Sequence, residues 1–282
     1  MQRQSEGPPH DHDLFAGTAA YYARYRPPYP AEVFDYLGHV FELGQGSTVL
    51  DLGCGTGQLA VPLARAGCQV WAVDPDPEMI VEGVRQEPVG GPGEIRWITG
   101  RAEDLRVADL PTIRLCTMGA SFHWMDRDHV LRVLDEVIGP GGGAALVSGS
   151  ASIWSRTGAL EGAWLEVTRE VITQFLGPRR RAGSGTYSHP ERTHEEVLLE
   201  SSFSAIEQRR FTSTRWLSVD EVIGQQLSTS YASPAQLGDQ LPAFRAELSR
   251  RLTEIAPKEG FETVEHTGVV LARRGSGGGG TE

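Results

Sequence analysis

Short apolar runs of strand length alternate with stretches of helical periodicity along the first half of the chain. The predicted strands are residues 49–52, 69–73, 95–99, 113–118 and 144–148, and the predicted helices are residues 31–41, 59–66, 78–84 and 129–138. Residues 139–143, of sequence Gly-Pro-Gly-Gly-Gly, form a predicted turn before the fifth strand. Strands that alternate with helices predict an α/β protein with a parallel, doubly wound sheet.

The alternation ends near Gly149, and strand signals return at residues 206–212 and 264–273, which makes a mostly parallel, seven-stranded sheet the expected fold. The stretches 151–203 and 217–260 are interpreted as helical insertions, which form either a cap over a substrate pocket or plain cover for one face of the sheet. The expected organisation is a mobile N-terminus (1–12), a core with an N-terminal lid (13–150), a cap (151–203), the end of the core sheet with the second insertion (204–274) and a mobile tail (275–282).

A glycine-rich loop follows the first predicted strand, in the sequence Asp51-Leu52-Gly53-Cys54-Gly55-Thr56-Gly57. Glycine is needed where the backbone takes a positive φ or where a ligand lies against the main chain. The next strand ends in Asp74, about 20 residues on, where a carboxylate typically accepts hydrogen bonds from ribose hydroxyls. The two features predict a site for a nucleoside-containing cofactor at the carboxyl ends of the strands.

The glycine pattern by itself also fits a dinucleotide cofactor. The spacing Gly55-x-Gly57-x-x-Ala60 matches the looser form of the dinucleotide fingerprint, which keeps an NAD(P)-dependent oxidoreductase as an alternative. The chain has no Tyr-x-x-x-Lys pair for hydride chemistry, and Lys258 is its only lysine. A protein that binds the cofactor without transferring a group, such as a partner subunit, is a second alternative, because binding and catalytic residues are largely separate in such folds.

Five motifs favour a different cofactor. The order Asp-x-Gly-x-Gly-x-Gly from Asp51 resembles motif I of class I S-adenosylmethionine-dependent methyltransferases, which have a Rossmann-like fold. Across residues 15–150 the chain resembles the bacterial small-molecule branch of this family, of the trans-aconitate and ubiquinone-biosynthesis types. The other motifs are Tyr22-Ala23-Arg24-Tyr25-Arg26-Pro27, Val73-Asp74-Pro75-Asp76-Pro77-Glu78-Met79, Gly100-Arg101-Ala102-Glu103-Asp104-Leu105 and Ser121-Phe122-His123-Trp124.

The resemblance implies an enzyme that transfers the methyl group of S-adenosylmethionine to an O, N or C nucleophile of a small molecule, with a role in secondary metabolism, and releases S-adenosylhomocysteine. The implied cofactor-binding residues are Tyr22, Arg26, Asp51, Gly53, Cys54, Gly55, Asp74, Pro75, Met79, Ala102, Glu103 and Ser121. Many relatives have an acid where this chain has Arg101, so the contact to the adenine amine passes to Glu103 or Asp104.

His123 is the histidine that the motifs place beside the sulfonium, and it is the candidate catalytic base for a hydroxyl acceptor; its alternative role is packing. The segment 15–29 is interpreted either as a lid that excludes water or as a structural staple for the first helix. His10, His12, His189 and His194 lie in polar segments and are expected to be solvated. We expect no metal site, since the one local cluster, His10 to Asp13, lies in the predicted mobile terminus.

Composition narrows the class of partner. The formal charge of −11 and the pI near 5.3 argue against a nucleic-acid partner, which requires a basic face. No apolar run is long enough to span a membrane, and no apolar leader is present near Met1. Cys54, Cys68 and Cys116 have no paired spacing and are expected to be reduced thiols, so a cytoplasmic location is expected.

Overall fold

The structure is a computed structural model that describes residues 14–87, 90–149, 153, 162–182, 185–186 and 191–275. The chain divides into two units. The sheet unit comprises residues 28–149, 190–211 and 267–282, and the helical unit comprises residues 1–27, 150–189 and 212–266. Apart from Gly275, the predicted mobile ends lie outside the described residues.

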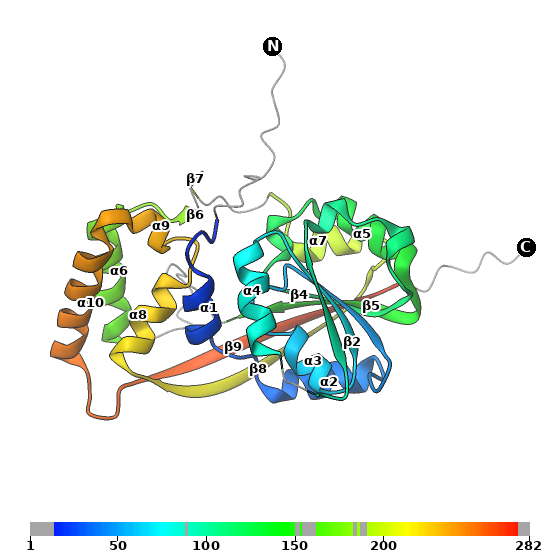
Figure 1. Ribbon diagram of the computed structural model, residues 1–282, viewed down its shortest axis with the longest axis horizontal. Coiled ribbons are helices and arrows are strands. Elements are labelled where there is room, and N and C mark those ends of the chain that lie inside the picture. Colours follow the sequence, from blue (N-terminus) through cyan, green and yellow to red (C-terminus); the bar gives the residue numbers. More distant parts are fainter. Residues whose placement is uncertain are drawn as a thin grey trace, which may run out of the picture. The chain divides into compact units, whose positions relative to one another are not determined.

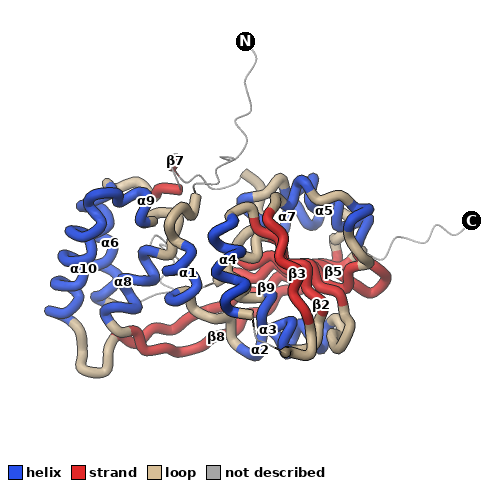
Figure 2. The backbone as a smooth tube through the Cα atoms, in the orientation of Figure 1, coloured by secondary structure: helices blue, strands red, loops and turns tan. Residues whose placement is uncertain are grey.

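Seven strands form one sheet in the order β3-β2-β1-β4-β5-β9-β8. Their bounds are β1 Thr48–Leu52, β2 Gln69–Asp74, β3 Glu94–Thr99, β4 Ile113–Gly119, β5 Ile138–Ser148, β8 Ala205–Leu217 and β9 Phe261–Arg273. The first five strands pair in parallel, and β5 pairs with β9 in antiparallel. The predicted doubly wound, mostly parallel seven-stranded sheet is therefore confirmed (Figure 2).

The predicted turn at residues 139–143 lies inside β5 instead of before it. Ile113 of β4 pairs with Ile138, but Leu115 already pairs with Gly143, so the glycines bulge out of the ladder between these two pairs. Gly141 takes a φ of 72° in the bulge, a conformation that disfavours other residues. The glycines do turn the backbone as predicted, but β5 pairs with β4 both before and after them.

Helices cover both faces of the sheet because successive strand residues point to opposite sides. Val49 and Leu115 belong to a buried cluster that includes residues of α2 (Ala31–Val40), α3 (Ala60–Arg65) and α4 (Pro77–Gln86). Leu50 and Cys116 belong to a second cluster with residues of α5 (Arg127–Val137) and α7 (His194–Leu199). Figure 1 shows α5 and α7 together on one side of the strands, and α2 and α3 on the other.

The order of the strands determines where a ligand can bind. The chain runs from β1 outward to β3, and then returns to place β4 on the other side of β1. In such sheets the crevice at the carboxyl ends of the two strands that flank the reversal is the usual binding site. Here those strands are β1 and β4, so the residues that follow Leu52 and Gly119 occupy this position.

The helical unit has its own apolar core. Its elements are α1 (Ala19–Tyr25), α6 (Ala163–Leu176), α8 (Val219–Leu227), α9 (Pro234–Leu237), α10 (Leu241–Ile255) and the two-residue strands β6 (Arg181–Ala182) and β7 (Gly185–Thr186). The ring of Tyr25 lies over Gly224 of α8, where an added Cβ would come within 2.3 Å of it, and the Tyr25 hydroxyl donates a hydrogen bond of 2.7 Å to Asp220. These contacts attach α1 to α8. No helix among the described residues has the length and apolarity needed to span a membrane.

Candidate functional site

The glycine loop after β1 is built from left-handed backbone. Gly53, Gly55 and Gly57 have φ values of 64°, 55° and 88°, a region that other residues enter at a cost of about 1–2 kcal/mol. The Gly53 and Cys54 N–H groups both donate to the Val73 carbonyl, at 2.8 and 3.0 Å. The loop is thereby attached to the end of β2.

The side chain of Asp74, at the end of β2, also binds the glycine loop. One carboxylate oxygen accepts the Gly55 N–H at 2.8 Å and the other accepts the Asp76 N–H at 2.9 Å. Burial raises the pKa of Asp74 to about 6, although these two hydrogen bonds lower it. Each carboxylate oxygen keeps a second lone pair, so the group can orient the loop and still accept a hydrogen bond from a ligand hydroxyl.

Asp51 is a fully buried acid at the centre of the sheet. Its Oδ1 accepts a hydrogen bond of 2.7 Å from the Thr117 hydroxyl of β4, while its Oδ2 is buried without a hydrogen-bond partner. Burial raises the pKa of Asp51 to about 7, against the opposing effect of the Thr117 hydrogen bond. A buried polar atom without a partner costs roughly 1–3 kcal/mol, so this oxygen is a candidate ligand contact.

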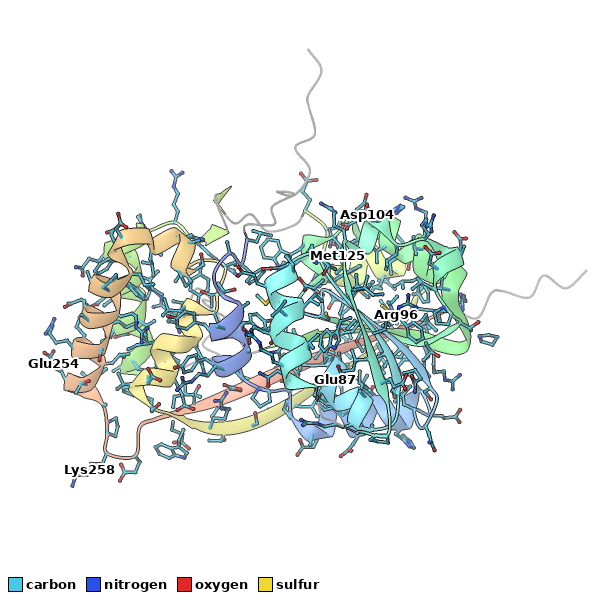
Figure 3. All side chains as sticks on the ribbon, viewed as in Figure 1. Glu87, Arg96, Asp104, Met125, Glu254 and Lys258 are labelled. Atoms are coloured by element: carbon cyan, nitrogen blue, oxygen red, sulfur yellow. The ribbon has the colours of Figure 1, made fainter. Side chains whose placement is uncertain are left out.

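Ser121 faces the loop from the end of β4. Its hydroxyl donates a hydrogen bond of 2.6 Å to the Leu52 carbonyl, and a Cβ added at Gly53 would lie 2.4 Å from the Ser121 Cβ. The methyl carbon of Met125, labelled in Figure 3, would lie 3.4 Å from the same added atom. Between β4 and Ser121, Ala120 is exposed and has a φ of 52°, which is strained for alanine. The ends of β1 and β4 therefore meet as the motifs predict.

The third glycine of the motif has a packing role that the motif alone does not reveal. A Cβ at Gly57 would lie 2.7 Å from the ring of Trp97, and a Cβ at Gly83 of α4 would lie 2.5 Å from it. Trp97 is thus enclosed by two glycines, and its indole N–H donates a hydrogen bond of 3.0 Å to Glu87, labelled in Figure 3. Nothing in the sequence spacing relates residues 57, 83 and 97.

The remaining predicted cofactor residues of the sheet unit follow β2 and β3: Pro75 lies in the loop after β2, Met79 in α4, and Ala102 and Glu103 in a short 3-10 helix (Ala102–Asp104) after β3. Met79 and Ala102 are buried, and Pro75 is exposed. Glu103 accepts the Asp126 N–H at 2.9 Å and forms an ion pair of 3.5 Å with Arg101. Arg101, the departure from the family pattern, therefore neutralises the neighbouring acid.

His123 lies in a short 3-10 helix (Phe122–Trp124) directly after Ser121 and is partly exposed. Its ring centroid is 4.5 Å from that of Trp124 and 6.2 Å from that of His194. His194 was expected to be solvated, but it is partly buried and its ring lies 5.3 Å from Phe122. The prediction from the polar sequence was wrong because α7 places the His194 ring against Phe122, in the motif that follows β4. His10, His12 and His189 lie outside the described residues.

Tyr22 and Arg26 belong to the helical unit. The Arg26 guanidinium lies over the Tyr22 ring at 4.9 Å, and the Arg26 Nε is buried without a hydrogen-bond partner. Their role toward a cofactor stays a prediction. In the described part of the chain no cluster of three or more histidine, cysteine or acidic side chains could hold a metal ion, and the three cysteines are buried free thiols.

Comparisons with known proteins agree with this geometry. Residues 49–142 match a family described as a methyltransferase domain. This match supports the resemblance of the chain to class I methyltransferases. An uncharacterized methyltransferase of Mycobacterium tuberculosis is 28% identical to it over 227 residues, which cover 79% of this chain and 80% of that protein.

Two solved structures show the same methyltransferase fold. A protein of Anaeromyxobacter dehalogenans, provisionally described as a type II methyltransferase, has a TM-score of 0.53 and 20% identity, and the match covers 89% of this chain and 98% of that one. A methyltransferase of Geobacter sulfurreducens in complex with S-adenosyl-L-homocysteine has a TM-score of 0.50 and 18% identity, with 93% and 98% covered. The motif resemblance is confirmed, and the likeness in fold covers about nine tenths of the chain.

Proposed function

We propose that this methyltransferase uses S-adenosylmethionine to methylate an O, N or C nucleophile of a small molecule in secondary metabolism. The observation that carries the proposal is the cradle at the ends of β1, β2 and β4: left-handed glycines at 53 and 55, the oriented carboxylate of Asp74 and the unpartnered oxygen of Asp51. The solved relative from Geobacter sulfurreducens, which contains S-adenosyl-L-homocysteine, supports the choice of cofactor.

The residues present suit this cofactor. Asp74 is suited to the ribose hydroxyls because its carboxylate has free lone pairs, and Asp51 offers a buried acceptor oxygen for a charged amino group. A side chain at residue 53 would overlap that of Ser121, so glycine allows the ends of β1 and β4 to lie close together. Pro75, Met79, Ala102 and Glu103 are assigned to the adenosine part, and Cys54, Gly55 and Ser121 to the methionine part.

When bound, S-adenosylmethionine supplies a methyl group on a sulfonium, which a nucleophile takes by in-line displacement. The chain then has to align the two reactants and exclude water, and such alignment alone is worth roughly 7–11 kcal/mol. His123 is assigned to accept the proton of a hydroxyl acceptor, because it lies two residues after Ser121 at the end of β4. Tyr22 and Arg26 are assigned to the lid.

The test is calorimetric titration of the full chain with S-adenosylhomocysteine, with NADH and NADPH as parallel titrants. We expect micromolar binding of S-adenosylhomocysteine alone, weakened at least tenfold by Asp74→Asn. Asp35→Asn, a change at an exposed acid on α2, is the matched control and should leave the affinity unchanged. Binding of a nicotinamide nucleotide in place of S-adenosylhomocysteine would instead support the oxidoreductase alternative.

Cofactor binding without transfer is the remaining alternative. A screen of small phenols, carboxylic acids and amines with S-adenosylmethionine, read as release of S-adenosylhomocysteine, separates it from the enzyme. Turnover with one class of acceptor supports the proposal. Tight binding with no release across all three classes would favour a non-catalytic partner subunit.

A further inference from the structure

The proposed reaction site has a second histidine beside it that no sequence motif predicts. His194 is the first residue of α7, and Thr193 caps that helix with a capping box: its hydroxyl accepts the Glu196 N–H at 3.1 Å, and Glu196 accepts the Thr193 N–H at 2.7 Å. The cap holds the first turn of the helix in place. The position of the His194 ring is therefore set by backbone structure and not by a flexible loop.

Arg127, at the start of α5, holds the same turn from the other side. Its Nη1 donates to the carbonyls of Arg192 and Thr193, at 2.9 and 3.3 Å, and lies 3.5 Å from Nδ1 of His194. A guanidinium has only donors, so this contact favours the neutral tautomer with Nδ1 as the acceptor and the proton on Nε2.

The two histidine rings lie nearly parallel. Their planes differ by 29° with the centroids 6.2 Å apart, and His194 also lies against Phe122, whose centroid is 5.3 Å away. Trp124 lies on the His123 ring from its own 3-10 helix. The His123 ring therefore lies between a ring of its own 3-10 helix and a ring of α7.

We propose that His194 is a positioning residue for His123: held by Thr193 and Arg127 and packed on Phe122, its ring orients the His123 imidazole at the end of β4. This inference rests on the proposed function, because it assigns His123 to the acceptor. It gives a helix that is distant in sequence a role in transfer to a nucleophile that must lose a proton, such as a phenol.

The surroundings of His194 favour its neutral ring. Burial and the nearby Arg127 cation lower the pKa of His194, while Glu195 opposes them. A second positive charge on His194 would face both Arg127 and a protonated His123.

The experiment is a pH titration by NMR of the full chain with isotope-labelled histidine, assigned with His→Phe and His→Gln variants. In the wild type we expect His194 to titrate below 6.5, and Arg127→Gln should raise that midpoint. His194→Ala should shift the ring resonances of His123, because a neighbouring ring is removed, and His194→Phe should restore most of that shift. His39→Gln, at an exposed histidine on α2, is the control and should change neither signal.

Calorimetry with S-adenosylhomocysteine on the same variants separates the two proposals. Unchanged affinity together with a moved His123 signal supports the positioning role. An unmoved His123 signal in His194→Ala, or a His194 midpoint insensitive to Arg127→Gln, overturns the positioning role and leaves the cofactor site intact. Loss of binding in the wild type itself would instead overturn the proposed function.

Discussion

Gly53 shows at the scale of one residue why the motif requires glycine. Two independent features require glycine at this position. Its φ is 64°, and an added Cβ would lie 2.4 Å from the Cβ of Ser121. Ser121 cannot give way easily, because its hydroxyl is bonded to the Leu52 carbonyl next to Gly53. Backbone conformation and side-chain space thus impose the same residue.

We therefore predict that Gly53→Ala lowers the free energy of unfolding by about 2–4 kcal/mol, combining the left-handed backbone with overpacking. It should also weaken S-adenosylhomocysteine binding at least tenfold, measured by calorimetry. Gly100→Ala is the control, since a Cβ there meets nothing within 4 Å and the φ is not positive. Equal stability and affinity in the two variants would contradict the account of Gly53.

At the scale of elements, α4 and β3 are joined by one tryptophan. Trp97 of β3 packs against Gly83 of α4 and Gly57 of the glycine loop, so both glycines leave room for one ring. Glycine inside a helix usually costs about 0.5–1 kcal/mol relative to alanine. In α4 that cost is offset by the close approach of helix and strand.

This packing reverses the usual effect of a Gly→Ala change in a helix. Gly83→Ala should destabilise the protein by about 1–3 kcal/mol, because the added methyl group meets a ring that is enclosed on both sides. Gly38→Ala in α2 should stabilise it by about 0.5–1 kcal/mol, because a Cβ there meets nothing within 4 Å. Urea unfolding of both variants measures the difference, and a stabilising Gly83→Ala would refute the packing argument.

Across the whole molecule, the buried acids of the site connect binding to global stability. The pKa of Asp51 is about 7 in the folded chain against an ordinary value of 3.8, because burial disfavours the charged form. The fold therefore favours the protonated acid. Its stabilising contribution is fully present below about pH 4 and is lost as the pH rises through about 7.

Asp51→Asn removes this titration but keeps a side-chain oxygen that can accept from Thr117. We predict that without ligand the variant has a free energy of unfolding at least about 1 kcal/mol higher than that of the wild type at pH 8. This difference in the free energy of unfolding should become smaller toward pH 5. Thermal unfolding at several pH values measures it. Asp74, whose pKa is also raised, is present in both proteins, and its charge is one cause of the raised pKa of Asp51. Parallel pH profiles would show that Asp51 is not the titrating group.

Much of the sheet could be predicted because strand and helix periods are local properties of the sequence. All seven strands lie where apolar runs or strand signals were found, with ends that differ by a few residues. The β5 bulge was mistaken for a turn outside the strand, since the Ile113–Ile138 pair is a long-range contact. The motifs predicted a site at the carboxyl ends of strands, and the parallel pairing of β1 with β4 places the reversal of strand order there.

The sequence by itself determined the fold class, the glycine loop and the family, because these depend on residue type at fixed spacing. Only the tertiary structure decided that Gly57 and Gly83 enclose Trp97, that one oxygen of Asp51 is buried without a partner, and that His194 lies against Phe122 and His123. These facts join residues that are far apart along the chain. They arise from packing in three dimensions, which local periodicity and motif spacing do not encode.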